Sequence, residues 1–468
     1  MSDTHDLVIL GSGSTAFAAA LRAQSRGARV LMIEKSMLGG TCVNWGCIPS
    51  KTLINVARMR RETGLGALVG LGTSEGEVDF TKLSEHKEHV VQFLRQSKYL
   101  DILQQVPGLT LVKGTGRFLD AHTIEVGDQR IHGERFLIAT GGSPRIINFP
   151  GLSEVDYLTS RSALLLKTLP KSLIVIGGGV IALELGQMYL RLGCEVTVLE
   201  HGPRILPIVE SEPVLALKKA LIDEGMQIEE GVAICSVSKK GESIVVAADI
   251  GGQRDEFSAE KLLLAVGTAP ATPGIGLEKA GVEVDDKGFV LVDEMLRTTA
   301  PGIWAAGDVT GGMMIATVGA REGIVAVDNM FDPECGCRMD YLTAPMAIFT
   351  DPEIGMVGHT EASAAKAGYD TVTNTMPVSA IPKAHVTGLA AGAITMVADR
   401  KTRRLLGVHL SCERGAELIN EAALALRCKL TIDELANTLH VYPSMGEGLR
   451  LCAQGFSRDL SKLSCCAE

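Results

Sequence analysis

Two cysteines close to the N-terminus have the clearest capacity for chemistry. Cys42 and Cys47 lie five positions apart in the stretch GGTCVNWGCIPSK. A regular helix would hold their Cα atoms about 7.5 Å apart, beyond disulfide range, so the helix must be distorted here. Gly46 supplies the backbone freedom for that distortion. Lys51, one turn further on, would lower a thiolate pKa or pair with a carboxylate such as Glu184. The stretch therefore predicts a redox-active pair.

The remaining nine of the eleven cysteines fall into three groups. Cys335 and Cys337 flank one glycine near a predicted domain junction, and incidental loop chemistry is favoured there over accessory metal capture. Cys465 and Cys466 are adjacent at the C-terminus, where they would chelate a soft cation more readily than form a disulfide. The others lie in apolar or helical patterns and are predicted to be small core residues: Cys194, Cys235, Cys412, Cys428 and Cys452.

A glycine turn must position a nucleotide near the redox pair. The sequence GSGSTA follows an apolar run over residues 6–10, and a second apolar run over 28–33 ends at Glu34. Gly11 permits the tight turn, Gly13 lets the backbone approach a pyrophosphate, and Ala16 is small enough for helix–strand packing. Glu34 is placed to bond ribose hydroxyls. The pattern predicts a dinucleotide-binding βαβ unit.

The same pattern returns over residues 173–199, as GGGVIA followed by an acidic residue at the same spacing. Gly177 and Gly179 take the two glycine roles and Glu200 the acidic one. A carboxylate there favours a free 2′-hydroxyl, whereas Arg204 would partly offset it, so the choice between NADPH and NADH stays open.

Further elements complete the predicted scaffold. The stretch 303–308 is predicted to be a strand that ends in Gly307-Asp308, where Asp308 would accept a hydrogen bond from a cofactor hydroxyl, and a helix is expected from near Gly311. A long amphipathic helix is expected over 81–105. From about residue 340 the pattern changes to strands (390–397 and 405–409) and a helix (416–426), which predicts a separate α+β domain.

Composition excludes several classes of protein. The 468 residues suffice for about three domains. The net charge is −10 and no basic run occurs, which predicts no nucleic-acid partner. No uninterrupted apolar run reaches about 18 residues, so no membrane span is expected. The N-terminus lacks the layout of a signal peptide, and a cytoplasmic location is predicted.

Together these motifs resemble the pyridine-nucleotide disulfide oxidoreductase family, which includes glutathione reductase, lipoamide dehydrogenase and thioredoxin reductase. The resemblance covers nearly the whole chain. It implies an α/β fold with two Rossmann-like dinucleotide-binding domains and a C-terminal α+β dimerisation domain. The implied boundaries are 1–150 and 271–339 for the FAD domain, 151–270 for the NAD(P)H domain, and 340–468 for the dimerisation domain.

The resemblance also assigns roles around the flavin. FAD and NADPH or NADH are the implied cofactors, in a homodimer whose active site is shared between subunits. Cys42 becomes the interchange thiol that faces substrate, and Cys47 the thiol that faces the flavin. Lys51 and Glu184 become the ion pair beside the ring, and Thr41 joins the cofactor-binding residues.

One departure selects a branch of the family. Disulfide-reducing members carry His-Pro-x-x-x-Glu near the C-terminus, but this chain has Tyr442 before Pro443, with Glu447 retained. A phenol with a pKa near 10 is a poor proton shuttle at neutral pH. His440 is an alternative, although its spacing to Glu447 is wrong.

The tyrosine and the Cys-Cys end resemble the mercuric reductase branch of the family, which reduces Hg(II) to Hg(0). That resemblance implies that Cys465 and Cys466 deliver Hg(II) to Cys42 and Cys47, with Tyr99 and Tyr442 flanking the ion. Two alternatives stay open. One is a thioredoxin-reductase-like or other disulfide reductase, and the other is a metal-sequestering protein without turnover.

Overall fold

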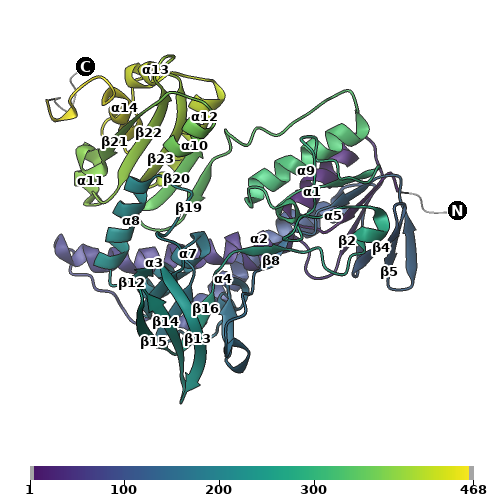
Figure 1. Cartoon of the computed structure of the whole chain (residues 1–468), viewed down its shortest axis with the longest axis horizontal. Helices are drawn as coiled ribbons and strands as arrows, with labels where there is room; N and C mark the ends of the chain where they lie inside the picture. Colours follow the sequence, from purple (N-terminus) through teal and green to yellow (C-terminus); the bar gives the residue numbers. More distant parts are fainter. Residues whose placement is uncertain (1–4, 463–468) are drawn as a thin grey trace.

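The computed structural model describes residues 5–462 (Figure 1). The first of its sheets has five parallel strands in the order β18-β7-β1-β2-β3. They are β1 (Leu7–Leu10), β2 (Val30–Glu34), β3 (Leu109–Lys113), β7 (Phe136–Ile138) and β18 (Ile303–Ala305). The four residues of β1 are all buried and apolar, as in a parallel sheet covered on both faces. Helix α1 (Ser14–Gln24) packs against α9 (Ala316–Phe331) on one face, so distant segments complete this unit.

A second five-stranded parallel sheet repeats the first, in the order β12-β11-β10-β16-β9. Its strands are β9 (Tyr157–Thr159), β10 (Ser172–Ile176), β11 (Glu195–Glu200), β12 (Gln227–Glu230) and β16 (Lys261–Leu264), and α7 (Val180–Leu192) follows β10. An antiparallel layer of β13 (Val232–Lys240), β14 (Ser243–Ile250) and β15 (Gln253–Ala259) adjoins it. The predicted repeat of the βαβ unit is therefore observed.

The C-terminal part is an antiparallel sheet with helices. The strand order is β19-β20-β23-β22-β21. The elements are β19 (Met346–Ile348), β20 (Glu353–Gly358), β21 (Thr371–Pro377), β22 (Ala393–Asp399), β23 (Leu405–Cys412), α10 (Glu361–Lys366), α11 (Pro382–Thr387), α12 (Gly415–Arg427), α13 (Ile432–Asn437) and α14 (Glu447–Gln454). Both predicted strands and the predicted helix lie within a few residues of these bounds. With the two parallel sheets, this arrangement confirms the predicted fold class.

Two predicted helices differ from those observed. The helix expected over 81–105 is α4 (Phe80–Arg95), a π-helical turn η1 (Gln96–Leu100) and α5 (Asp101–Gln105) in succession. The helix expected from Gly311 begins only at Ala316, so that prediction was wrong. Gly311 has φ +76°, a left-handed conformation that ends the short turn before it and cannot start a right-handed helix.

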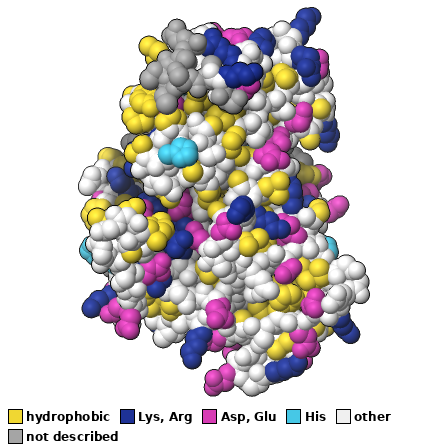
Figure 2. All heavy atoms as spheres, turned by 90° about the vertical axis from the view of Figure 1, so that its left-hand side faces the viewer, with side chains coloured by type: hydrophobic (Ala, Val, Ile, Leu, Met, Phe, Trp, Pro, Cys, Tyr) yellow, Lys and Arg dark blue, Asp and Glu magenta, His cyan; other side chains and the backbone are white. Residues whose placement is uncertain are grey.

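Further helices and strands complete the described chain. They are α2 (Gly40–Trp45), α3 (Cys47–Leu68), α6 (Ser160–Ala163), α8 (Ser211–Asp223), the antiparallel strands β4 (Gly116–Asp120), β5 (Thr123–Val126) and β6 (Gln129–His132), and the pair β8 (Gly142–Pro144) with β17 (Thr268–Pro270). Among residues 5–462, no helix combines the length and apolarity needed to cross a bilayer. Figure 2 shows acidic and basic side chains interspersed over one face, without a region of a single sign.

Candidate active site

The helix carrying the two cysteines is interrupted between them, as predicted. Helix α2 ends at Trp45 and α3 begins at Cys47, with Gly46 at φ −124° and ψ −111° between them. A Cβ atom on Gly46 would lie 3.0 Å from the Thr41 carbonyl oxygen and 3.4 Å from Cys42 Cα. Gly46 is therefore needed for its lack of a side chain, because the chain folds back closely on the turn that precedes it.

The interruption brings the two thiols into hydrogen-bonding contact. Both side chains are partly buried and neither is in a disulfide. The hydrogen bond from Cys42 is the main reason why the pKa of Cys47 falls to about 7, and the charge of Lys51 lowers it further against the opposing effect of burial. The same hydrogen bond, with burial, raises the pKa of Cys42. At pH 7 about half of the pairs therefore hold one proton and one negative charge, and the other half hold two protons.

Lys51 and Glu184 form the ion pair that the sequence suggested. Lys51 Nζ lies 2.5 Å from Glu184 Oε2, and the glutamate side chain is only 4% exposed. The second carboxylate oxygen accepts a hydrogen bond of 2.9 Å from the Phe349 backbone N–H. Lys51 Nζ also lies 4.8 Å from the centre of the Phe349 ring. A buried carboxylate with both oxygens satisfied fixes the lysine beside the thiols.

Helix α7 extends this contact along one face toward the C-terminal sheet. One turn after Glu184, the Gln187 amide donates to the Asp351 carbonyl at 2.8 Å and accepts from the Asp351 N–H at 2.8 Å. One turn further on, Arg191 binds the Asp351 carboxylate at 2.9 Å and the Glu224 carboxylate at 2.9 Å. No local sequence pattern marks Gln187 and Asp351 as partners, because the two residues are more than 160 positions apart.

Tyr99 reaches the cysteine pair from the π-helical turn. Its ring packs edge-on against Phe17, with centroids 4.8 Å apart, and a Cβ on Gly39 would lie 3.2 Å from it. Burial raises the pKa of Tyr99, and the charges of Cys42 and Cys47 raise it further. π-Helical turns occur frequently at functional sites, because the extra residue redirects side chains. The phenol is thus neutral and lies close to both thiols.

The first glycine turn has the shape that a dinucleotide pyrophosphate requires. Gly11 has φ +115°, and a Cβ there would lie 2.2 Å from the Ala139 carbonyl oxygen. Gly13 precedes α1 without a side-chain cap, so the first N–H groups of the helix are free for an anion. Ala16 is fully buried. Glu34, at the end of β2, accepts hydrogen bonds from Ser12 Oγ at 2.6 Å and the Ser36 N–H at 2.7 Å. These residues fit FAD.

The glycine turn and the redox helix are in direct contact. The Gly39 N–H donates to the Ser12 carbonyl at 3.1 Å, and a Cβ on Gly40 would lie 2.6 Å from Gly13 Cα. Gly39 and Gly40 both have positive φ, at +94° and +64°. Thr41, the next residue, is exposed on α2. A pyrophosphate on this turn would therefore lie next to the helix that carries the thiols.

Asp308 follows β18, as predicted, and burial raises its pKa. A neighbouring carboxylate, which sequence reasoning missed, supports the turn before it. Glu322 is 1% exposed and accepts hydrogen bonds from the Gly307 N–H at 2.6 Å and the Tyr341 hydroxyl at 2.7 Å. Its pKa is raised by burial. The only sequence signal for it was a charged residue among the apolar positions of α9.

The second glycine turn repeats the first. Gly177 has φ +111°, with its Cβ position 2.5 Å from the Ala265 carbonyl oxygen, and a Cβ on Gly179 would meet nothing within 4 Å. Gly179 precedes α7 without a side-chain cap. The Glu200 carboxylate accepts from the Gly178 and Gly202 N–H groups. These residues fit a nicotinamide dinucleotide.

Arg204 is held by its own loop. Its Nη2 donates to the carbonyls of Pro207 at 3.0 Å and Val209 at 2.7 Å. Its Nη1 is buried and has no hydrogen-bond partner among residues 5–462. The guanidinium therefore keeps donor capacity, although its direction is set by the two carbonyls.

The fold of one chain does not bring Tyr442 or Glu447 to the thiols. Glu447 opens α14, 3% exposed, and Tyr442, 48% exposed, precedes it; Figure 1 shows α14 in the C-terminal unit, apart from α2. His440 Nε2 lies 2.8 Å from Glu421 Oε1, so its carboxylate partner is Glu421 instead of Glu447. A cavity of about 480 Å³ is lined in part by Pro443, the residue that follows Tyr442.

The predictions for the other cysteines were correct only in part. Cys194, Cys412 and Cys452 are buried, as predicted, whereas Cys235 is partly exposed and Cys428 is exposed, so the prediction of core positions was wrong for these two. Cys428 is the C-cap that follows α12, where a helical pattern no longer determines burial. Cys335 and Cys337 are joined in a disulfide. Cys465 and Cys466 lie outside the described residues.

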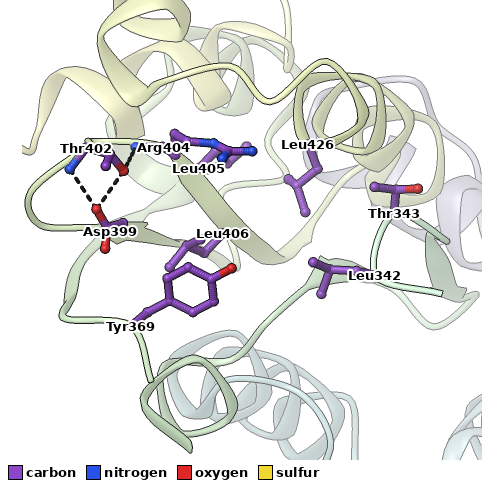
Figure 3. Close-up of a pocket in the computed structure, with 9 residues that line it drawn as sticks. All are labelled: Leu342, Thr343, Tyr369, Asp399, Thr402, Arg404, Leu405, Leu406 and Leu426. Atoms are coloured by element: carbon purple, nitrogen blue, oxygen red, sulfur yellow. Dashed lines mark hydrogen bonds between the residues drawn. The ribbon is translucent and has the colours of Figure 1, made fainter. Parts of the chain in front are cut away.

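A second cavity, of about 180 Å³, contains none of the predicted site residues. In it Leu342 and Thr343 face the C-terminal sheet, with Tyr369 at the wall and Asp399 bonded to Thr402 (Figure 3). No group of three or more His, Cys, Asp or Glu side chains suited to a metal occurs in the described part of the chain.

Comparison with known proteins agrees with this geometry. The pyridine nucleotide-disulphide oxidoreductase profile matches residues 5–323, and the dimerisation-domain profile of the same family matches 344–453. A mercuric reductase of Staphylococcus aureus is 40% identical, over 99% of this chain and 84% of that protein. A dihydrolipoyl dehydrogenase of Thermus scotoductus is 37% identical, over 97% and 98%. The structure titled as the Cu(II) complex of the HOCl-induced flavoprotein disulfide reductase RclA from Escherichia coli superposes with a TM-score of 0.87 at 31% identity, over 97% and 99%.

The chain belongs to the pyridine nucleotide-disulphide oxidoreductase family. It is accordingly an NAD(P)H-dependent flavoprotein oxidoreductase, and its cofactors are FAD and a nicotinamide dinucleotide. It also carries the family's dimerisation domain.

Proposed function

We propose that this enzyme reduces Hg(II) to Hg(0) with electrons from NAD(P)H. The observation that carries the proposal is the thiol–thiolate pair of Cys42 and Cys47, in a chain with Tyr442 where an acid–base histidine would serve a disulfide substrate. Reduction of a soft cation needs sulfur ligands and no proton for a leaving thiolate. Support also comes from the name of the relative in Staphylococcus aureus.

We infer the following roles at the pair. Hg(II) arrives bound to two thiolates and exchanges them for Cys42 and Cys47; two Hg–S bonds form, two break, and the Cys42 proton leaves with a released thiol. Bound FAD supplies the two-electron connection between the nicotinamide and this site. Reduction of Hg(II) by two electrons would break both new bonds and leave two thiolates, and one proton taken up from solvent would return the pair to thiol and thiolate. Lys51 offsets the charge on sulfur, and the neutral Tyr99 phenol flanks the ion.

The domain assignment and the nucleotide contacts are part of the same proposal. Residues 1–150 and 271–339 would hold FAD, through Gly11, Gly13, Ala16, Glu34, Thr41, Lys51 and Asp308. Residues 151–270 would hold the nicotinamide dinucleotide, through Gly177, Gly179, Glu200 and Arg204. Each set of residues includes the glycine before a helix, α1 or α7, that has no side-chain cap. The free N–H groups at such a helix N-terminus can bind a pyrophosphate.

Residues 340–468 would form the contact between two copies of the chain. Tyr442 and Glu447 lie apart from Cys42 within one chain, so a shared site requires them to come from the partner. The segment around Tyr442 suits such a contact, because Leu439 and Val441 are 83% and 78% exposed. Cys465 and Cys466 would then pass Hg(II) to the pair of the other subunit.

Steady-state kinetics with four oxidants tests the proposal. NAD(P)H oxidation should depend on Hg(II) in excess thiol, and oxidised glutathione, lipoamide and thioredoxin should be poor substrates. Replacement of both tail cysteines by alanine should lower Hg(II) turnover at high thiol concentration, whereas Cys428→Ser, which removes an exposed cysteine elsewhere, should not. Rapid lipoamide reduction without Hg(II) turnover would instead favour a dehydrogenase like that of Thermus scotoductus.

A further inference from the structure

Cys335 and Cys337 lie in the segment between α9 and β19, outside the helices that carry the redox pair. Their Cα atoms are 5.2 Å apart, shorter than the roughly 6.6 Å that two residues span in an extended strand. The difference arises at Gly336, whose φ of +54° bends the chain. A Cβ on Gly336 would meet nothing within 4 Å, so the outer side of the bend is open.

Hydrogen bonds from helix α9 hold the backbone of this bend in place. Asn329 on α9 is 5% exposed, and its side-chain amide donates to the Cys337 carbonyl at 2.9 Å and accepts from the Cys337 N–H at 3.0 Å. The Cys335 N–H donates to the Asp332 carbonyl at 3.0 Å. Both cysteines therefore have anchored backbones, and their sulfurs face one another at a partly exposed position. A ligand pair held in this way is preorganised.

We propose that Cys335 and Cys337, in their reduced form, are a second binding site for one soft divalent cation, with Hg(II) as the cation of this enzyme. The choice of cation rests on the function proposed above; the two-thiolate site does not. A thiol in excess first reduces the disulfide, giving two cysteine thiols and one oxidised thiol dimer. Hg(II) carried by two thiolates then exchanges them for the two cysteines, and each cysteine proton leaves with a released thiol. No oxidation state changes at the metal.

The two sulfurs should act together. After the first Hg–S bond forms, the second thiol meets the ion at the high effective concentration set by the short, anchored turn. An isolated cysteine has no such advantage and loses the ion to excess monothiol. Hg(II) bound at this position would be held without reduction until a thiol or the tail removes it.

Equilibrium retention of Hg(II) without NAD(P)H tests this site separately from turnover. The background is the full chain with Cys42, Cys47, Cys465 and Cys466 replaced by alanine, equilibrated with Hg(II) in excess glutathione and then desalted. Mercury is measured per chain by elemental mass spectrometry. We expect about one Hg(II) in the background and in its Cys428→Ser control, and a loss of at least tenfold in Cys335→Ser, Cys337→Ser and the double variant.

Equal retention in the double variant and the background would overturn the proposal, as would retention in either single variant. Should a serine variant fold poorly, the mass of the native peptide that contains both cysteines, isolated from the unsubstituted enzyme after Hg(II) loading, decides: one Hg(II) on that peptide supports the site and none overturns it. Retention at this pair in an enzyme that oxidises no NAD(P)H with Hg(II) would refute the proposed function alone.

Discussion

The charge distribution over the cysteine pair leads to a prediction that can be measured without turnover. The hydrogen bond from Cys42 is the largest reason why the pKa of Cys47 is about 7. Cys42→Ala removes that donor, and the pKa of Cys47 should move toward the ordinary thiol value of about 8.5. At pH 7 the thiolate fraction would fall from about one half to about 3%, roughly 15-fold. Cys42→Ser keeps a hydroxyl donor and should shift the pKa less.

The assay is the pH profile of Cys47 alkylation by iodoacetamide, followed by mass spectrometry of its peptide. The midpoint of the profile reports the pKa of Cys47 directly, whereas the rate at a single pH also depends on how nucleophilic the thiolate is. A thiolate of higher pKa is intrinsically more nucleophilic, by about fivefold for this shift, so the rate at pH 7 would fall only about threefold. A midpoint that stays near 7 in Cys42→Ala would refute the reasoning and assign the low pKa to Lys51.

Three further predictions follow from buried contacts. Lys51→Met should raise the alkylation midpoint of Cys47. Adding Glu184→Gln should reverse part of that rise, because the negative charge of Glu184 itself raises the pKa of Cys47. Equal midpoints in the single and double variants would contradict this. Gly11→Ala should reduce the flavin content of the purified protein severalfold, since its Cβ would lie 2.2 Å from the Ala139 carbonyl, whereas Gly27→Ala, at φ +81° with open space around it, should retain flavin. Burial raises the pKa of Glu322 above its unfolded value, so the free energy of unfolding should fall as pH rises from about 4.3 through the folded pKa. The neutral Glu322→Gln variant should lack that component, and parallel thermal-unfolding midpoints of the two proteins between pH 4.5 and 8 would argue against it.

Local sequence patterns were sufficient to predict the elements whose conformation is determined by a few neighbouring residues. Gly11 and Gly177 each require a positive φ beside a buried strand, so the two βαβ units could be placed closely from the sequence. The interruption at Gly46 could also be predicted, because no regular helix joins cysteines at that spacing. In each case the constraint acts within a few residues of the position that reveals it.

Contacts across the fold could not be predicted in this way. Nothing around Gln187 indicates that its amide pairs with the backbone of Asp351, and nothing in the apolar pattern of α9 indicates that Glu322 meets the Tyr341 hydroxyl. The π-helical turn at Tyr99 was equally hidden, because one extra residue per turn hardly alters an amphipathic pattern. These features depend on tertiary packing, which decides the partner after the local structure has formed.

The polar face of α7 has a consequence for how the enzyme can move. Three successive turns of this helix are bonded to the segment around Asp351, and the first of them also holds Lys51. A rigid-body rotation that moved α7 away from the segment around Asp351 would separate Lys51 from Glu184 and expose the Glu184 carboxylate, which is now buried. These contacts oppose such a movement, so α7 is expected to keep its position against the segment around Asp351 while the nicotinamide binds and leaves.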